Sequence, residues 1–378
     1  MRKAFRLLQI VGARPQILKS AALTRAWSER SPDSFKLLTL HTGQHYSHEL
    51  SASFYDELDI PRPEENLGIG SASHGEQTAM MMESIAEYLS RTKPHGVIVY
   101  GDTNSTLAGS LAASRMGLPV FHIEAGLRSG NLNMPEEVNR IATDHLSTLL
   151  FCPTEEAMGN LMSEGIPNSP RSVGEDVPMI YFTGDVMCDN LIHFKQKAEI
   201  PKEIQGLVSD EQGFILVTCH RPANTDNESV FRKILAALKR LCGQGNRVIF
   251  PCHPRVSSMY TELIEESKGV DGLHIISPVG YLEMIWLISR AEVVMTDSGG
   301  IQKESFMLER PCVVLRDDTE WVELLDGGHV LLTKRNPDAI LQAVDRAKRN
   351  NLDYPAMYGD GNAAEIILEH IMMYLARC

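Results

Sequence analysis

The chain has 378 residues, and 49 Asp and Glu outnumber 36 Lys and Arg, which gives a formal net charge of −13 at pH 7. This length exceeds one ordinary hydrophobic core and predicts two domains of about 150–200 residues each. The acidic balance disfavours nucleic acid as a partner. No apolar run approaches the ~20 residues that span a bilayer, so we expect no membrane partner either.

Short β-branched runs alternate with longer helical patterns along the whole chain. The first half predicts strands at 5–11, 35–40, 97–100, 120–123 and 149–152, and helices at 79–91 and 106–115. The second half predicts strands at 214–219, 247–251, 274–276, 292–296 and 311–315, and helices at 230–241, 282–289 and 339–349. This alternation is typical of right-handed parallel crossovers. We therefore expect an α/β fold with two doubly wound parallel sheets and a cleft between them, divided near Gly184.

Seven cysteines are scattered along the chain without a CxxC pair. This pattern is typical of reduced thiols rather than of a disulfide framework. The apolar stretch that follows Met1-Arg2-Lys3 is too short for the core of a signal peptide. Both observations predict a cytoplasmic protein.

Charged and polar residues gather just past the predicted strands. In open parallel sheets, ligands bind beyond the carboxyl ends of the strands. The residues at those positions are Arg14, Gln44, His45, Asp102, Glu124, His220, His253 and Asp297-Ser298-Gly299-Gly300. Their positions predict a ligand site at the strand ends.

The segment Asp297-Ser298-Gly299-Gly300 is typical of an anion site, because two glycines admit a close ligand and a helix start offers free N–H groups. Glu304, one turn further, is placed to accept hydroxyls of a ribose. The alternative is a plain glycine turn with a surface glutamate. The chain has neither a GxGxxG segment after an early strand nor a GxxxxGK[ST] segment, which disfavours dinucleotide and Walker-type sites.

Four further side chains have both a chemical and a structural interpretation. Glu124 ends a short apolar strand. Asp102 is a candidate reacting group and also suits a helix N-cap, and the two roles are compatible. Glu136 lies near the start of a helix, and its alternative role is an i,i+4 ion pair with Arg140. His220 is a diphosphate ligand, a proton shuttle or a core histidine. The histidines at 41, 45 and 48 suit no single helix face, so we expect no metal site.

At these residues the sequence resembles the non-hydrolysing UDP-N-acetylglucosamine 2-epimerases over essentially its whole length. The matching segments are Gly12-Ala13-Arg14-Pro15, Gly101-Asp102-Thr103, Glu124-Ala125-Gly126-Leu127-Arg128, Pro135-Glu136-Glu137, Asn139-Arg140, His220-Arg221, Asp297-Ser298-Gly299-Gly300-Ile301-Gln302, Glu304 and Tyr358-Gly359-Asp360-Gly361. Many segments in the right order make the resemblance specific.

The resemblance implies two Rossmann-like domains in the GT-B-like arrangement of many nucleotide-sugar glycosyltransferases. Residues 1–183 would form the sugar-binding and catalytic domain, and residues 184–362 the UDP-binding domain. Residues 363–378 would form a terminal helix that crosses back to the first domain. The resemblance also implies a homodimer, a UDP-sugar substrate, and neither a cofactor nor a metal.

The resemblance also assigns roles to individual residues. The catalytic set would be Asp102, Glu124, Glu136 and His220. The groups that bind substrate or UDP would be Arg14, Lys19, Arg140, His253, Tyr281, Ser298, Gly299, Gly300, Glu304 and Arg316. The implied reaction eliminates UDP from carbon 1 as the carbon 2 proton leaves, and then adds UDP back after protonation from the other face.

Several segments depart from the common bacterial N-acetylglucosamine enzymes. Gln16 replaces a usual Glu, Pro222-Ala223-Asn224 replaces a usual Arg-Glu pair, and Trp321-Val322 stands where Arg-Pro is common. With residues 100–106 and 279–286, these departures resemble the subgroup that acts on UDP-2,3-diacetamido-2,3-dideoxy-glucuronate for lipopolysaccharide O-antigen. The alternatives are a UDP-N-acetylglucosamine epimerase, a hydrolysing epimerase, a glycosyltransferase of the same architecture and a non-enzymatic sensor of nucleotide sugars.

Overall fold

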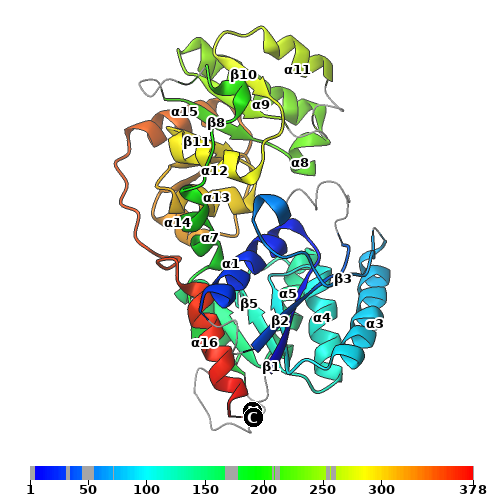
Figure 1. The fold of residues 1–378 in the computed structure, drawn as a ribbon. Coiled ribbons are helices and arrows are strands. Elements are labelled where there is room, and N and C mark those ends of the chain that lie inside the picture. Colours follow the sequence, from blue (N-terminus) through cyan, green and yellow to red (C-terminus); the bar gives the residue numbers. More distant parts are fainter. Residues whose placement is uncertain are drawn as a thin grey trace. The chain divides into compact units, whose positions relative to one another are not determined.

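The structure is a computed structural model. It describes residues 5–30, 35–44, 55–70, 72–166, 178–206, 208, 213–252, 256 and 261–377. The chain divides into two compact units (Figure 1). Unit 1 comprises Met1–Ile192 with Met357–Cys378, and unit 2 comprises His193–Ala356.

Unit 1 is built on a seven-stranded parallel sheet in the order β3-β2-β1-β4-β5-β6-β7. Its strands are β1 (Phe5–Val11), β2 (Phe35–His41), β3 (Glu65–Asn66), β4 (Gly96–Tyr100), β5 (Val120–Ile123), β6 (Leu149–Cys152) and β7 (Met179–Phe182). Its helices are α1 (Arg14–Arg30), α3 (His74–Thr92), α4 (Asn104–Arg115), α5 (Pro135–Leu146), α6 (Glu155–Ser163) and α16 (Ala363–Leu375), while α7 (Val186–Lys195) runs across the border into unit 2.

Unit 2 is built on a six-stranded parallel sheet in the order β10-β9-β8-β11-β12-β13. Its strands are β8 (Ile215–Thr218), β9 (Val248–Pro251), β10 (Leu273–Ile276), β11 (Val293–Thr296), β12 (Cys312–Val314) and β13 (Val330–Leu332). Its helices are a short 3-10 turn (Lys202–Ile204), α8 (Pro222–Thr225), α9 (Glu228–Gly243), α11 (Thr261–Lys268), α12 (Tyr281–Arg290), α13 (Gly299–Met307), α14 (Val322–Asp326) and α15 (Pro337–Arg349).

Each sheet closes its own core. In unit 1, Leu8 and Val97 of the central strands pack with Met81 and Ile85 of α3. Figure 1 shows α3 and α4 together beside this sheet. In unit 2, the buried face of α9 packs on β8 and β9. The predicted α/β class, the parallel sheets and the ten predicted strands are confirmed, whereas the short strands β3, β7 and β13 were missed.

Strand order reverses once in each sheet. In unit 1 the chain winds outward in both directions from β1 and β4, and in unit 2 from β8 and β11. Ligands bind at such switch points, beyond the carboxyl ends of the strands. The fold therefore points to the turns after β1, β4, β8 and β11.

Helix α16 packs on unit 1 through both ends. Its Tyr374 ring meets Phe121 of β5 edge-on at 5.8 Å between centroids, and His370 stacks on Tyr181 of β7 at 3.8 Å. Asp189 of α7 accepts the first backbone N–H groups, from Ala363 at 3.1 Å and Ala364 at 2.7 Å. These contacts make the chain's last helix part of unit 1.

Within the described parts of the chain, helices that are both long and apolar enough for a membrane span are absent.

Candidate active site

The switch point of unit 1 is organised by one buried amide. The Gln16 Oε1 atom accepts from the backbone N–H groups of Gly12 at 2.8 Å and Ala13 at 3.1 Å. Its Nε2 atom donates to the Tyr100 carbonyl at 3.0 Å and to Thr106 Oγ1 at 2.9 Å. Gln16 therefore ties the turn after β1, which carries Arg14, to the turn after β4.

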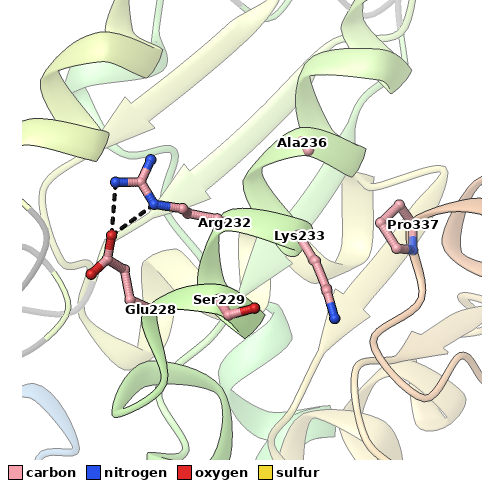
Figure 2. Close-up of a pocket in the computed structure, with 6 residues that line it drawn as sticks. All are labelled: Glu228, Ser229, Arg232, Lys233, Ala236 and Pro337. Carbon is pink, nitrogen blue, oxygen red and sulfur yellow. Dashed lines mark hydrogen bonds and ion pairs between the residues drawn. The ribbon is translucent and has the colours of Figure 1, made fainter.

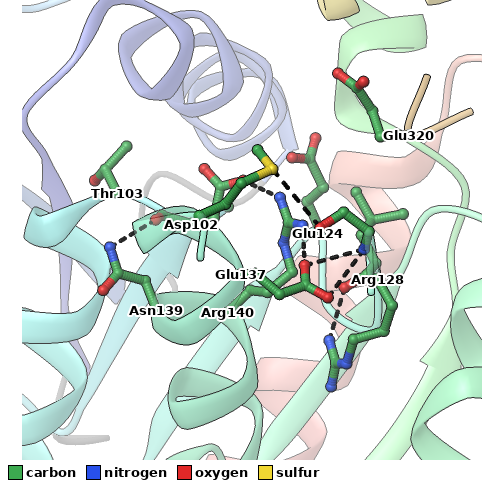
Figure 3. Close-up of polar contacts among 12 residues, drawn as sticks. Asp102, Thr103, Glu124, Arg128, Glu137, Asn139, Arg140 and Glu320 are labelled. Carbon is green, nitrogen blue, oxygen red and sulfur yellow. Dashed lines mark hydrogen bonds and ion pairs between the residues drawn. The ribbon is translucent and has the colours of Figure 1, made fainter. Parts of the chain in front are cut away.

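The turn after β4 places Asp102 against a guanidinium. Arg140 of α5 forms an ion pair with Asp102 Oδ2, and its Nη1 donates to Glu137 Oε2 at 2.6 Å (Figure 3). The Asn139 Nδ2 atom also donates to the Asp102 backbone carbonyl at 3.0 Å. Burial lowers the pKa of Arg140, but Asp102 and Glu137 raise it more, so the net pKa shift is upward. Asp102 is thus held by α5 at both its backbone and its side chain.

Glu124 follows the neighbouring strand β5 and pairs with a second cation. Lys19 Nζ of α1 donates to Glu124 Oε1 at 2.7 Å, and both side chains are about nine-tenths buried. Glu124 has a φ of 67°, in the left-handed region that ordinary residues avoid, and such strain clusters at functional sites. A Cβ on Gly101, which precedes Asp102, would lie 3.1 Å from Lys19 Nζ and 3.4 Å from Glu124 Oε1. The Lys19–Glu124 pair therefore lies directly against the Asp102 turn.

The two adjacent glutamates of α5 have opposite environments. Glu136 is exposed, whereas Glu137 is 1% exposed and accepts from the backbone N–H groups of Ser129 and Gly130 as well as from Arg140. Burial raises the pKa of Glu137, but these hydrogen bonds lower it more, so its net pKa shift is downward. The alternative interpretation of Glu136, as an ion-pair partner of Arg140, is wrong, because Arg140 pairs with Asp102 and Glu137 instead.

The switch point of unit 2 is organised by Asp297, which is fully buried at the end of β11. Its carboxylate accepts from the backbone N–H groups of His220 at 3.0 Å and Arg221 at 2.9 Å, and from Asn224 Nδ2 at 2.9 Å. The His220 Nδ1 atom lies 3.3 Å from Asp297 Oδ1, and the His220 side chain is 44% exposed. The core-histidine interpretation of His220 is therefore wrong.

The glycine turn after Asp297 opens α13. Ser298 caps the helix, its Oγ accepting from Ile301 N at 3.4 Å. A Cβ on Gly299 would collide with the Glu320 carboxylate, whereas a Cβ on Gly300 would meet only Ser298 Oγ at 3.9 Å. A side chain at position 299 would thus have to displace the Glu320 carboxylate, while the exposed Gly300 leaves its backbone open to a ligand.

The other predicted substrate groups lie in varied settings. Arg14 is exposed and Glu304 is buried on α13, while Tyr281 is half-buried at the start of α12. Arg316 donates to Glu320 Oε2 at 2.8 Å and to Asp318 Oδ1 at 3.3 Å. His253 lies outside the described residues.

The comparisons with known proteins decide the family. Residues 28–372 match the family described as UDP-N-acetylglucosamine 2-epimerase. The chain belongs to this family. A UDP-2,3-diacetamido-2,3-dideoxy-D-glucuronate 2-epimerase of Pseudomonas aeruginosa is 41% identical over 97% of this chain and 99% of its own. A UDP-N-acetylglucosamine 2-epimerase homolog of Methanococcus maripaludis is 42% identical over 96% of this chain and 98% of its own.

A solved structure supports the same family. The Methanocaldococcus jannaschii UDP-GlcNAc 2-epimerase in complex with UDP-GlcNAc and UDP superposes with a TM-score of 0.84 at 36% identity, over 98% of this chain and all of that one. The resemblance inferred from the sequence is confirmed, as is the GT-B-like fold of two parallel-sheet domains. As a member of the UDP-N-acetylglucosamine 2-epimerase family, the chain is an isomerase.

The described surface of unit 2 also has a hollow. This hollow of 640 Å³ lies on α9 and the start of α15, and it contains none of the predicted site residues (Figure 2). Over the same described residues, groups of three or more His, Cys, Asp or Glu that could hold a metal are absent.

Sequence reasoning on this epimerase missed Gln16 and Glu137 as organisers of the site. Gln16 was noted only as a departure from relatives, and Glu137 only as the second Glu of a motif. A usable signal existed for Glu137, since it lies three residues before Arg140 and an i,i+3 pair shares a helix face.

Proposed function

We propose that the chain inverts carbon 2 of a UDP-2-acetamido sugar without hydrolysis. The observation that carries this proposal is the pair of carboxylates after neighbouring strands, Asp102 after β4 and Glu124 after β5, each held by its own cation. Two fixed carboxylates on neighbouring turns suit a reaction that removes a proton from one face of a carbon and returns it to the other.

The chemistry of carbon 2 requires more than a base. No carbonyl adjoins carbon 2, so simple deprotonation is too slow, and elimination solves the problem. A carboxylate takes the carbon 2 proton as the bond from carbon 1 to the UDP oxygen breaks, which leaves a glycal and UDP. Protonation of carbon 2 from the other face and attack of UDP on carbon 1 then give the epimer.

We assign proton transfer first to Asp102 and Glu124, and next to Glu136 and His220. In this assignment residues 1–183 supply the sugar chemistry and residues 184–362 bind UDP, with the terminal helix 363–378 joined to the first domain. Ser298, Gly299 and Gly300 would hold the diphosphate at the start of α13, where free N–H groups stabilise the leaving charge. Glu304 would hold the ribose, and the remaining assigned contacts are Arg14, Lys19, Arg140, His253, Tyr281 and Arg316.

We further propose UDP-2,3-diacetamido-2,3-dideoxy-glucuronate as the substrate and its mannuronate epimer as the product. The 41% identical relative from Pseudomonas aeruginosa bears the name of that reaction. The place of such a sugar in lipopolysaccharide O-antigen, a cytoplasmic location and a homodimer complete the proposal. A UDP-N-acetylglucosamine 2-epimerase is the second candidate, because the Methanococcus maripaludis relative, which is 42% identical to this chain, is named as a homolog of that enzyme.

Proton NMR in deuterium oxide tests the reaction and the substrate together. The enzyme is incubated separately with UDP-2,3-diacetamido-2,3-dideoxy-glucuronate and with UDP-N-acetylglucosamine. With its substrate, the carbon 2 proton signal should disappear as the signals of the manno epimer grow, and we expect faster turnover of the diacetamido compound. Free sugar would indicate hydrolysis instead. Absence of exchange with both compounds would contradict the proposal and favour a glycosyltransferase or a sensor.

Replacement of the carboxylates tests the assigned roles. Glu124→Gln and Asp102→Asn should each lower kcat at least 100-fold, the lower end of what one acid or base contributes, while UDP affinity stays within about threefold. Glu87→Gln is the matched control, because Glu87 is exposed on α3 of the same unit. Equal loss of turnover and UDP affinity would contradict a role in proton transfer.

A further inference from the structure

A fully buried histidine lies beneath the Asp102 turn. His122 is the third residue of β5 and is 0% exposed, as is Asp144 of α5. The His122 Nε2 atom lies 2.8 Å from the Gly101 carbonyl oxygen, and Nδ1 lies 2.7 Å from Asp144 Oδ1. Gly101 directly precedes Asp102, so this histidine contacts the turn that carries the proposed base.

The neighbours of His122 define which ring nitrogens carry protons. A backbone carbonyl only accepts hydrogen bonds, so Nε2 must donate to Gly101. Asp144 receives two donors on its other oxygen, from Arg128 Nη1 at 2.7 Å and the Gly126 backbone N–H at 3.2 Å. Such donors stabilise the carboxylate form of Asp144, which again only accepts. Nδ1 must therefore donate as well.

The surrounding charges balance a second proton on the ring. Arg128 also binds Glu164 through two contacts of 2.7 Å, so with a neutral ring one cation would face the two carboxylates of Asp144 and Glu164. A buried charge is tolerated when it is paired and hydrogen-bonded in this way. The group links β5, α5 and α6 under the site.

We propose that His122 is an imidazolium that donates from both ring nitrogens and positions the Gly101-Asp102 turn for catalysis. Gly101 has a φ of 62°, a conformation that glycine adopts freely, so its own backbone preference does not fix the turn. The Nε2–H donor helps to hold the turn, together with the bond from the Gly101 N–H to the Ile123 carbonyl at 2.9 Å, while Asp144 anchors the ring. His122 acts through Asp102 and not on the substrate, so this inference rests on the proposed function for its catalytic consequence.

The protonation state is tested on the wild-type protein by ¹⁵N-edited NMR of the histidine rings at pH 7.5. We expect one imidazole with two slowly exchanging N–H protons, because His122 is shielded from solvent. His329 is an internal reference, since its Nε2 lies 2.7 Å from the Asp353 carbonyl and calls for one N–H proton. A neutral His122 ring with one N–H would overturn the proposal without bearing on the proposed reaction.

The positioning role is tested with His122→Gln. A misplacement of about 1 Å in a reacting group can lower activity by up to about 100-fold. We expect a loss in kcat of this size with KM and UDP affinity within twofold. His95→Gln is the matched control, because His95 lies at the other end of β4 and bonds the Arg6 backbone N–H. An unchanged kcat in a folded His122→Gln protein would overturn the role, whereas an inactive wild type would refute the proposed function alone.

Discussion

At the scale of single residues, the site depends on which polar groups are paired and buried. Glu137 is buried and accepts from three donors, the backbone N–H groups of Ser129 and Gly130 and the Arg140 guanidinium, whereas its neighbour Glu136 is exposed. Of these two adjacent residues of α5, Glu137 therefore has a structural role, and Glu136 is the one with a proposed catalytic role. The same contrast separates Gly299, whose Cβ would collide with Glu320, from the open Gly300.

Replacing the two glutamates in turn should separate stability from catalysis. Glu137→Gln removes a buried partner of Arg140 and should lower the free energy of unfolding by about 1–3 kcal/mol. Glu136→Gln changes an exposed side chain. It should alter the free energy of unfolding by less than about 0.5 kcal/mol while lowering kcat. Urea unfolding and the NMR assay measure both effects. Equal destabilisation by the two changes would contradict the environments described.

Gly300→Ala tests the diphosphate site without disturbing the fold. A Cβ at this position finds open space, and alanine favours a helix over glycine by up to about 1 kcal/mol. We therefore expect unchanged or slightly higher stability, but at least tenfold weaker UDP binding, because the methyl group would occupy the surface offered to the phosphates. Calorimetric titration with UDP measures the affinity. Unchanged affinity would move the diphosphate away from the start of α13.

At the scale of elements, the last helix is held by a carboxyl group from α7. Burial raises the pKa of Asp189 to about 6 from 3.8, although the N–H groups of Ala363 and Ala364 and the charge of Arg25 oppose this shift and Asp185 adds to it. The folded protein then binds more protons than the unfolded chain between about pH 4 and pH 6. As pH rises through this window, ionisation of Asp189 therefore lowers the free energy of unfolding, by about 3 kcal/mol in total.

Asp189→Asn should flatten this pH dependence. About half of the effect falls between pH 5 and pH 8, so wild type should lose about 1.5 kcal/mol more than the variant over that interval. Urea unfolding at the two pH values, in the same salt, measures the difference between the two proteins. Identical losses would show that the pKa of Asp189 is the same in the folded and unfolded states, which would contradict the upward shift.

The sequence predicted the elements better than their contacts. β-branched runs located ten strands because buried parallel strands are continuously apolar. Strands β3 and β13 were too short to show a pattern. The bond from Asp189 to Ala364 joins residues 175 positions apart, and no local signal marks such a partner. Asp102 was open to interpretation as an N-cap, but Thr103 caps α4 instead, since its side chain accepts from Thr106 N.

At the scale of the whole molecule, the chain carries two sheets with separate cores and one switch point in each. The charged residues that follow β1, β4 and β5 lie in unit 1, and those that follow β8 and β11 lie in unit 2. In the proposed function, the diphosphate site at the start of α13 lies in unit 2, whereas Asp102 and Glu124, the first choices for proton transfer, lie in unit 1. The predicted cleft between the two units stays a prediction, as does the domain division at residue 183.

This division of labour predicts where UDP protects the chain. A ligand at 100 times its Kd adds about 2.7 kcal/mol to the stability of the structure that binds it. Hydrogen exchange of the full chain, with and without UDP, should therefore slow mainly in unit 2, around β8, β11 and the first turn of α13. Amides of β4 and β5 should change less with UDP alone, because their carboxylates face the sugar in the proposed reaction. Protection confined to unit 1 would reverse the assignment, since the diphosphate would then lie nearer Arg14 and Lys19 than Ser298 and Gly300.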